Sequence, residues 1–372
     1  MIAAGLVFAL LIAEAGFHLF PGLLPPAVRQ AVAIYNDSRA TEDTYKPFIA
    51  DDRLMFAPQP GLDLTIHSGL DLQYTVRTRT LDDSGVGFRD IGAIEPAYAV
   101  AVGDSFTWGT NVAAAETWVE RLQDRLAAPV LNLGVRGYGP SQYQIVTEDH
   151  GLIHHPRVVI WGFFTGNDIA NSADYADWVA GGKGDPDFIG RVDVAPGFLA
   201  QHVRLYELAK LLLHRGVYQQ GSGALSLPQT GGPKWLFYPK DLQTLADSSS
   251  PRIARGWELT QQAIRETAAA AAAAGAELVI LVIPSKELVY WPLIGRHLDN
   301  PEAFHLDEPV RALDDFCRQE ALHCLDLTPA FAEQTQAGTE LYFRQDAHWN
   351  AAGHQLAADL LANYLTEQGL QP

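Results

Sequence analysis

The chain has 372 residues, of which 48% are hydrophobic and 19% are charged, and this balance excludes a disordered tail or linker protein. Its formal net charge is −18, from 26 Lys and Arg against 44 Asp and Glu. Such a charge repels phosphate backbones, so we expect no nucleic-acid partner. It also repels anionic lipid headgroups, so any membrane contact requires a hydrophobic segment.

The first 24 residues form such a segment. Residues 2–13 are apolar without interruption, and only Glu14 and His18 break the apolar run that follows. A spanning helix needs about 20 apolar residues, so we predict a transmembrane anchor or a signal segment. Ala13-Glu14-Ala15 fits a signal-peptide cleavage site, and a buried N-terminal helix is the other alternative. Both targeting interpretations place the remaining chain outside the cytoplasm.

Residues 25–96 are predicted to form a small β-containing lead-in. They are rich in Asp and Pro and contain short alternating runs such as residues 72–80. From Ala97 to the C-terminus, apolar strands alternate with amphipathic helices, which predicts one domain with a parallel sheet covered by helices. The predicted strands are Tyr98–Val102, Val130–Leu133, Val158–Phe164, Glu277–Ile283 and Cys324–Leu327. The predicted helices are Thr117–Leu126, Ser141–Glu148, Arg255–Ala274, Pro309–Glu320 and Ala351–Tyr364.

An insertion is predicted at about residues 169–251, after the third strand, because this interval is too long for a connecting loop. Its aromatic side chains line a substrate cleft or pack a small core of their own: Trp178, Phe188, Trp235 and Phe237. Cys317 and Cys324 are the two cysteines of the chain. They either form a disulfide in an oxidising compartment or are two small buried side chains.

Polar residues follow three of the predicted strands. Gly103-Asp104-Ser105 follows the first strand and precedes a helix, Gly134 follows the second, and Gly166-Asn167-Asp168 follows the third. Ligands bind beyond the C-terminal ends of parallel strands, so these residues are expected at one functional edge. Each also has a structural alternative: an N-cap turn at the serine, a plain turn at the glycine, and an Asx turn at Asn167.

A histidine near the C-terminus completes a candidate triad. A serine hydroxyl needs a base to take its proton, and the base needs an acceptor that fixes its tautomer. His348 can be the base and Asp346, two residues earlier, the acceptor, with Ser105 as the nucleophile. His354 on the following helix is interpreted as a structural histidine.

The four blocks Gly103-Asp104-Ser105, Gly134, Gly166-Asn167-Asp168 and Asp346-Ala347-His348 resemble the SGNH (GDSL-type) hydrolase superfamily. The resemblance implies a three-layer α/β/α flavodoxin-like fold, and a catalytic triad of Ser105, His348 and Asp346. It also implies an oxyanion hole formed by the N–H groups of Ser105 and Gly134 and the side chain of Asn167. Most members place two residues between acid and base, whereas one residue separates them here. That spacing, the following Trp349 and residues 283–290 resemble the alginate O-acetyltransferase-like branch.

The sequence therefore predicts a serine-dependent esterase or O-acyltransferase for acyl esters, in particular acetyl esters, of envelope or extracellular carbohydrate. A polysaccharide O-acetyltransferase proper is the alternative, with a membrane acyl donor as a candidate partner. Neither a cofactor nor a metal is expected. Two other classes of protein are alternatives: a metal-dependent phosphoesterase using Asp104, Asn167, His348 and His354, and a non-catalytic carbohydrate-binding scaffold. We expect an extracytoplasmic protein held at the membrane by its N-terminal helix.

Overall fold

The computed structural model describes residues 2–24, 48–68, 72–92, 94, 97–183, 203–213, 225–227 and 234–372. The chain divides into two compact units, which we describe separately. One contains residues 1–47, 65–73 and 187–222, and the other contains residues 48–64, 74–186 and 223–372. The predicted Phe188 lies outside the described residues.

The larger unit is built on a parallel sheet of five strands in the order β13-β12-β9-β7-β8. The strands are β7 (Ala99–Gly103), β8 (Val130–Asn132), β9 (Val158–Phe164), β12 (Glu277–Ile283) and β13 (His323–Asp326). This is the flavodoxin-like order, in which the first strand of the sheet is flanked by the second and third. The predicted fold class is thereby confirmed, and each predicted strand is present within one residue.

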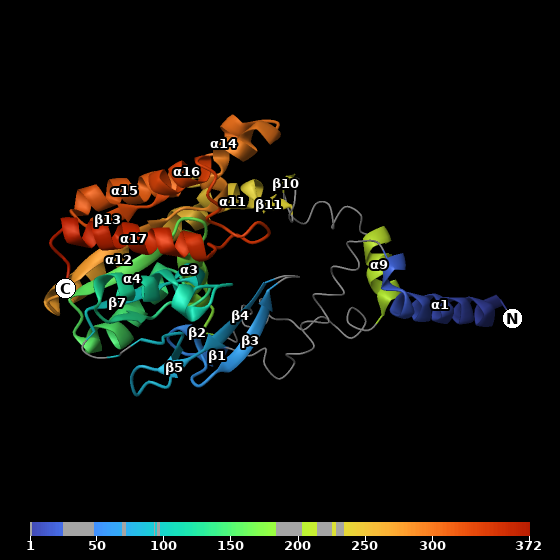
Figure 1. Cartoon of the computed structure of the whole chain (residues 1–372), viewed down its shortest axis with the longest axis horizontal. Helices are drawn as coiled ribbons and strands as arrows, with labels where there is room; N and C mark the ends of the chain where they lie inside the picture. Colours follow the sequence, from blue (N-terminus) through green and yellow to red (C-terminus); the bar gives the residue numbers. More distant parts are fainter. Residues whose placement is uncertain are drawn as a thin grey trace. The chain divides into compact units, whose positions relative to one another are not determined.

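Helices cover both faces of this sheet, which gives the three layers expected of a doubly wound fold (Figure 1). On one side α5, α6 and α12 pack against one another, and α15 contacts α12 through the rings of Trp257 and Phe316. On the other side α4 packs against α17, and Phe331 of α16 packs on Trp349 in the same core. The helices are α3 (Ser105–Trp108), α4 (Trp118–Leu126), α5 (Pro140–Val146), α6 (Asp168–Ala180), α11 (Pro239–Ala246), α12 (Pro251–Ala273), α13 (Lys286–Val289), α14 (Trp291–Ile294), α15 (Glu308–Glu320), α16 (Thr328–Gln336) and α17 (Ala351–Glu367).

Local sequence explains where the long helix α12 begins and ends. It starts at Pro251, four residues before the predicted start, because proline is accepted in the first turn of a helix. It ends in a run of alanines, and Gly275 then adopts a φ of +80°, a left-handed conformation that favours glycine. Strand β12 begins two residues later and pairs with β9 along its whole length.

The predicted lead-in contains short paired strands. These are β1 (Phe48–Asp51), β2 (Met55–Pro58), β3 (Asp63–Ser68), β4 (Leu72–Arg77), β5 (Arg79–Thr80) and β6 (Gly87–Phe88). Arg89 is 1% exposed and donates to the carbonyls of Thr75, Trp108, Gly109 and Val112. The lead-in therefore satisfies the orphan carbonyls at the end of α3.

The C-terminal tail is fixed at the N-terminal ends of the strands. The Tyr98 hydroxyl, just before β7, donates to the carbonyl of Leu370. Both residues are buried, so the last turn after α17 closes the core at the N-terminal ends of the strands.

The smaller unit contains the N-terminal helix α1 (Ile2–Leu19), a short helical turn η1 (Pro21–Leu23) and α9 (Arg204–Leu213). Glu14 accepts hydrogen bonds from the backbone N–H groups of Arg204 at 2.6 Å and Leu205 at 2.8 Å. One of the two polar residues that interrupt the apolar segment therefore caps the neighbouring helix. Within the described residues, no helix combines the length and the apolar character needed to cross a bilayer.

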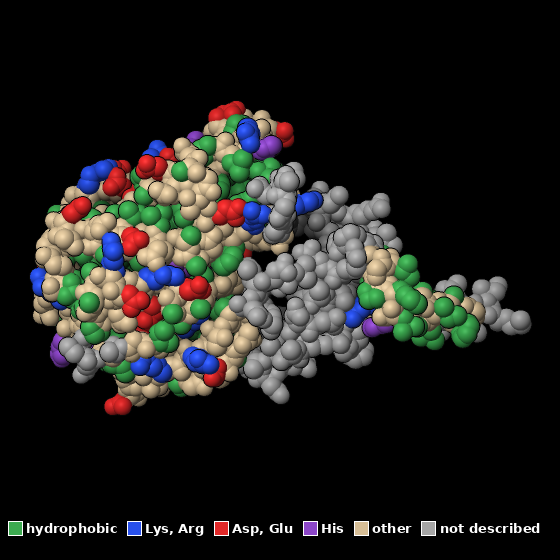
Figure 2. Space-filling model, viewed as in Figure 1, with side chains coloured by type: hydrophobic (Ala, Val, Ile, Leu, Met, Phe, Trp, Pro, Cys, Tyr) green, Lys and Arg blue, Asp and Glu red, His purple; other side chains and the backbone are tan. Residues whose placement is uncertain are grey.

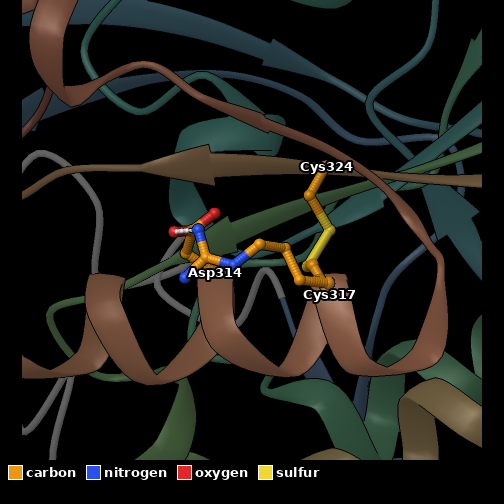
Figure 3. The surroundings of a disulfide bond; sticks show 4 residues. Asp314, Cys317 and Cys324 are labelled. Atoms are coloured by element: carbon orange, nitrogen blue, oxygen red, sulfur yellow. Dashed lines mark hydrogen bonds and ion pairs between the residues drawn. A yellow bond between two sulfur atoms is a disulfide. The ribbon is translucent and has the colours of Figure 1, made fainter.

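Cys317 and Cys324 form a disulfide that joins α15 to β13 (Figure 3). Their Cα atoms are 6.3 Å apart, within the normal range for a disulfide. This outcome decides between the two sequence interpretations. It also links an edge strand of the sheet covalently to the helix that precedes it.

Reduction of this disulfide is expected to lower the free energy of unfolding by about 2 kcal/mol, because a short closed loop regains its entropy in the unfolded chain. Urea denaturation with and without a thiol reductant measures this change. The Cys317→Ala/Cys324→Ala variant is the control, and the reductant should leave its transition unchanged. Two titratable thiols in the native, non-reduced protein would contradict the disulfide.

Candidate active site

Three of the predicted site residues lie where neighbouring strands end. Ser105 begins α3 directly after β7, Gly134 follows β8, and Asn167 precedes α6 after β9. Strands β8 and β9 flank β7, so their C-terminal ends meet at the point where the strand order reverses. This is the position at which open parallel sheets bind ligands.

Helix α3 lies unusually close to the sheet because glycines line the surface beneath it. A Cβ atom at Gly103 would lie 2.1 Å from Thr107 Oγ1, and one at Gly162 would lie 2.4 Å from the same atom. A Cβ atom at Gly134 would lie 2.4 Å from the backbone nitrogen of Trp108. The three glycines come from β7, β9 and the turn after β8, so each strand end leaves room for the helix that carries Ser105.

Asn132, at the end of β8, connects this helix to the neighbouring turn. Its Nδ2 donates to the carbonyl of Thr107 at 2.9 Å, and its Oδ1 accepts from the N–H of Gly134 at 3.0 Å. Its backbone N–H donates to Asp90 of the lead-in at 2.7 Å. The N–H of Gly134, which was predicted to donate to an oxyanion, therefore donates to Asn132 within the same turn. The close approach to Trp108 provides a separate reason for a glycine at position 134.

The structure brings Ser105, His348 and Asp346 together across 243 positions of sequence. His348 Nε2 lies 2.7 Å from Ser105 Oγ, and His348 Nδ1 lies 2.6 Å from Asp346 Oδ1. The backbone N–H of His348 also donates to Asp346 Oδ1 at 2.8 Å. The single residue between Asp346 and His348 thus forms a tight turn in which the carboxylate meets both the ring and the backbone of the histidine.

The protonation of Asp346 defines the roles of the two ring nitrogens. Burial favours its neutral form, but the charge of His348, hydrogen bonds from His348 and the nearby Lys286 outweigh burial and hold the pKa of Asp346 below its ordinary value. An ionised carboxylate only accepts hydrogen bonds, so Nδ1 carries the proton that it accepts. In the neutral ring, Nε2 is then free to accept the Ser105 hydroxyl proton.

Aromatic packing fixes the ring of His348. Its centroid lies 5.0 Å from that of Phe106, which follows the serine. Trp349 is fully buried and packs on Phe106 and Phe331. Tyr342 pairs with Trp349 in an antiparallel bridge, which holds together the two ends of the loop that carries Asp346 and His348.

Two buried acids lie beneath the serine. Asp104 caps α3 through the N–H of Phe106 at 2.9 Å, and burial raises its pKa to about 6. Its Oδ2 is 3.3 Å from Ser105 Oγ, a longer contact than the one to His348. Asp168 accepts from the Tyr143 hydroxyl and the Phe164 N–H, both at 2.9 Å, and burial raises its pKa well above the ordinary value. Both acids therefore have structural partners.

Asn167 precedes α6 without capping it. Its side chain makes no hydrogen bond to the first turn of that helix, so the Asx-turn alternative does not apply. Its Oδ1 is buried and has no hydrogen-bond partner among the described residues. The side-chain amide is thus not committed to holding the local backbone.

Lys286 is the residue whose contribution the sequence did not reveal. It is 1% exposed, and its Nζ donates to the carbonyls of Leu236 and Arg344, both at 2.8 Å, and of Asp346 at 3.1 Å. The segment around it resembles a family branch, but nothing local in Ser285-Lys286-Glu287 indicates a contact 60 residues away.

The aromatic residues of the predicted insertion are packed rather than open. Trp235 and Phe237, on strand β11 (Trp235–Phe237), are buried and stacked with ring centroids 5.8 Å apart, and both contact Tyr290. Strand β11 pairs with β10 (Leu225–Leu227). Trp178 belongs to α6, and its ring lies 5.7 Å from that of Tyr175. The insertion's aromatics that the structure describes therefore favour packing over a substrate cleft.

His354 is buried on α17, and its Nδ1 accepts from the backbone N–H of Trp118 at 3.1 Å. Burial lowers its pKa to about 3, so it is a neutral, structural histidine, as predicted. Among the described residues, no group of three or more His, Cys, Asp or Glu side chains is arranged to hold a metal ion.

Comparison with known proteins places this geometry in a family context. Residues 229–372 match the family described as SGNH hydrolase-like domain, acetyltransferase AlgX. The probable alginate O-acetylase AlgJ of Pseudomonas putida is 31% identical over 96 residues, which cover 26% of this chain and 24% of that protein. The match thus spans about a quarter of the length of this curated relative. The predicted resemblance to the SGNH hydrolase superfamily, near the AlgX and AlgJ branch, is confirmed.

Solved structures of low sequence identity were also found. A putative lipolytic protein of the G-D-S-L family from Desulfitobacterium hafniense is 14% identical, covers 72% of this chain and 98% of its own, and has a TM-score of 0.39. The acetyl xylan esterase AlAXEase is 12% identical, covers 71% and 98%, and has a TM-score of 0.39. Together, the family match and the curated relative support an enzyme of the SGNH-type ester hydrolase or acyltransferase class.

Replacement of Gly134 by Ala is expected to lower the free energy of unfolding by about 1–3 kcal/mol, because the added methyl meets backbone rather than a movable side chain. It should also displace α3 and slow any reaction of Ser105. Thermal unfolding and labelling of Ser105 by a fluorophosphonate measure the two effects.

The matched control is Gly295→Ala. Gly295 has a helical φ of −55°, and its nearest neighbour is a side-chain atom of Trp291 at 3.4 Å. This variant should unfold and react like the wild type. Equal stability of the Gly134→Ala variant and the wild type would show that α3 is not held as closely as described.

Proposed function

We propose that this protein is a serine-dependent SGNH-type esterase or O-acyltransferase acting on acyl esters, in particular acetyl esters, of envelope or extracellular carbohydrate. The observation that carries the proposal is the pair of contacts from His348, 2.7 Å to Ser105 Oγ and 2.6 Å to Asp346 Oδ1. A hydroxyl, an imidazole and a carboxylate in this sequence of contacts are the parts that nucleophilic ester chemistry requires.

In the first step Ser105 Oγ attacks the ester carbonyl while His348 Nε2 takes the hydroxyl proton. The ring then carries a positive charge, which the carboxylate of Asp346 stabilises through Nδ1–H. When the tetrahedral intermediate collapses, the C–O bond to the alcohol breaks and His348 returns the proton to the leaving oxygen. The product is an acyl-serine and a free alcohol.

The negative oxygen of the tetrahedral intermediate needs hydrogen-bond donors. The N–H of Ser105 and the side-chain amide of Asn167 are the two donors that we assign. Gly134 was a third candidate, but its N–H donates to Asn132 at 3.0 Å, so it contributes only if that bond is shared or exchanged. In other enzymes, removal of one such donor slows the reaction by about a hundredfold or more, so two donors are enough to stabilise this intermediate substantially.

The acyl-serine is resolved by water in an esterase and by a sugar hydroxyl in a transferase. The two outcomes share every residue of the first step, so the acceptor decides between them. The names of the matched family, an acetyltransferase, and of the curated relative, a probable O-acetylase, favour transfer to a polysaccharide as the finer proposal. A transferase of this kind also needs an acyl donor, for which a membrane partner is the candidate.

The Ser105→Ala variant should lose turnover of a small acetyl ester, because no nucleophile remains, while its thermal unfolding stays close to that of the wild type. Incubation of the wild type with the acetyl ester and an oligosaccharide, followed by product separation, distinguishes the two chemistries. Acetate alone indicates an esterase, and acetylated oligosaccharide indicates a transferase.

Full activity of the Ser105→Ala variant would refute the proposal. Loss of wild-type activity on chelation would favour metal-dependent chemistry instead. Carbohydrate binding without turnover, unchanged in the variant, would favour a non-catalytic scaffold.

We also propose that the protein works outside the cytoplasm and that α1 contacts a membrane. The disulfide supports an oxidising compartment, because such bonds persist mainly outside the cytosol. Large apolar side chains are exposed along α1 and just after it: Phe8, Leu10, Leu11, Ile12, Leu19, Phe20 and Leu23. Figure 2 shows hydrophobic side chains gathered over this helix. Contiguous exposed apolar surface of this kind marks a membrane or protein contact.

The Phe8→Glu/Leu11→Glu variant should bind neutral phosphatidylcholine vesicles at least about tenfold more weakly than the wild type, because each lost side chain contributes about 2 kcal/mol. Vesicle co-sedimentation measures the difference. Ile91→Glu/Ile153→Glu, which alters exposed apolar residues of the larger unit, is the matched control and should bind like the wild type. A wild-type protein that stays in the supernatant would contradict a lipid contact.

A further inference from the structure

Lys286 occupies a position that connects three parts of the larger unit. It is the first residue of α13, shortly after β12, and Ser285 caps this helix through its hydroxyl, which accepts from Leu288 N–H at 3.2 Å. An ammonium group has three N–H donors, and all three are used on backbone carbonyls. One carbonyl belongs to β11, and the other two lie in the loop that bears the acid and base.

The loop contacts are specific to the segment around Asp346. Nζ binds the carbonyl of Arg344 at 2.8 Å and that of Asp346 itself at 3.1 Å. The Arg344 carbonyl also accepts from the N–H of Leu236 at 2.8 Å, and the Tyr342 hydroxyl donates to the Pro284 carbonyl at 2.8 Å. The loop is therefore tied to β11 and to the end of β12, and Lys286 is the cation at the centre of these bonds.

Aromatic rings enclose the same ammonium. Nζ lies 5.1 Å from the ring centroid of Trp235 and 4.9 Å from that of Phe237. These distances are in the range of cation–π attraction, which compensates in part for the loss of water. Burial of the Lys286 ammonium costs desolvation free energy even with this set of partners. A role in solubility does not explain a lysine that is shielded from water.

Resting on the function proposed above, we propose that Lys286 is a positioning residue of the site. Its ammonium fixes the backbone of residues 344–346, so that the Asp346 carboxylate meets His348 Nδ1. Lys286 does not touch the reacting atoms. It acts through Asp346, which in turn orients the base.

The charged groups around Lys286 set how this role depends on pH. Burial lowers the pKa of Lys286 to about 8, against Glu287 on its own helix and Asp346 on the loop, which raise it. Glu287 is itself buried and accepts from Tyr238 N–H at 2.8 Å, and the Arg344 guanidinium lies over the same Trp235 ring. Above this pKa the amine has two N–H donors for three carbonyls, and the longest contact, to Asp346, is the one we expect to be lost.

The effects on activity and on stability have opposite signs. The pKa of Lys286 is lower in the folded protein than its ordinary value of 10.5, so the folded state binds this proton less tightly than the unfolded state does. The contribution of this group to stability therefore rises as the pH increases from about 8 towards 10.5. Over the same interval the positioning of Asp346 weakens. Activity is therefore expected to fall over a pH interval in which deprotonation of Lys286 does not lower the stability of the fold.

The experiment compares the full-length wild type with Lys286→Met, Lys286→Arg and Lys240→Met, measuring kcat and KM for an acetyl ester at increasing pH. Lys286→Met should lower kcat about ten- to a hundredfold with KM little changed, because misplacement by about an ångström has such effects. Lys286→Arg keeps the charge and does not titrate in this range, so it should remain active and lack the fall near pH 8. Lys240, which is exposed on α11, is the control and should behave like the wild type.

A kcat of Lys286→Met equal to that of the wild type would overturn the inference, as would an alkaline fall that persists unchanged in Lys286→Arg. If Lys286→Met does not fold, the Lys286→Arg profile decides the question alone. An active Ser105→Ala variant would refute the proposed function itself. An inactive Ser105→Ala variant together with wild-type behaviour of both Lys286 variants would refute only the positioning role.

Discussion

The close seating of α3 on the sheet is the constraint on which the site depends. Thr107 and Trp108 lie where side chains at Gly103, Gly134 and Gly162 would be, so the one-turn helix sits directly on the strand ends. Because α3 is so short, its position is determined by this fit, by Asn132 and by the Arg89 contacts at its end rather than by helical stability. Ser105 is thereby held at a fixed height above the sheet, within reach of a loop from the far end of the chain.

The sheet was predictable because its strands carry a strong local signal. Strand β9 is an unbroken apolar run buried on both faces, and β12 is one after the exposed Glu277, which is typical of a parallel sheet; the bounds of both match the prediction. Ser105 was predictable because it follows a strand whose end lies at the functional edge. His348 and Asp346 were predictable because an imidazole and a carboxylate two residues apart suit the roles of a base and its acceptor. Helix α6 lies almost wholly within the predicted insertion, which was assigned from the length of that interval, and it is not among the predicted helices; it packs against α12 and α5.

The contributions of Lys286, Gly162 and Arg89 could not be predicted, because each depends on contacts that no local pattern encodes. Lys286 lies in a segment that reads as an ordinary helix start, and its partners are 50 to 60 residues away. Gly162 lies inside β9, where Thr107 of α3 occupies the space that a side chain at this position would need. Arg89 appears in a lead-in without visible chemistry, yet it binds the end of α3.

The family match covers only part of the site. Residues 229–372 include Lys286, Asp346 and His348, whereas Ser105, Gly134 and Asn167 precede it. The two groups meet through the β9–β12 pairing, which runs in register over residues 158–164 and 277–283. The site is therefore a property of the whole sheet rather than of the segment that carries the family signature.

The anchoring of Leu370 by Tyr98 has a practical consequence. This contact lies at the edge of the sheet opposite the serine, and Gln371 beyond it is exposed. A fluorophore or a surface linker attached at Gln371 would leave the rim with Ser105 facing the solution, so that immobilised molecules could all be presented to a polymeric ligand in the same orientation.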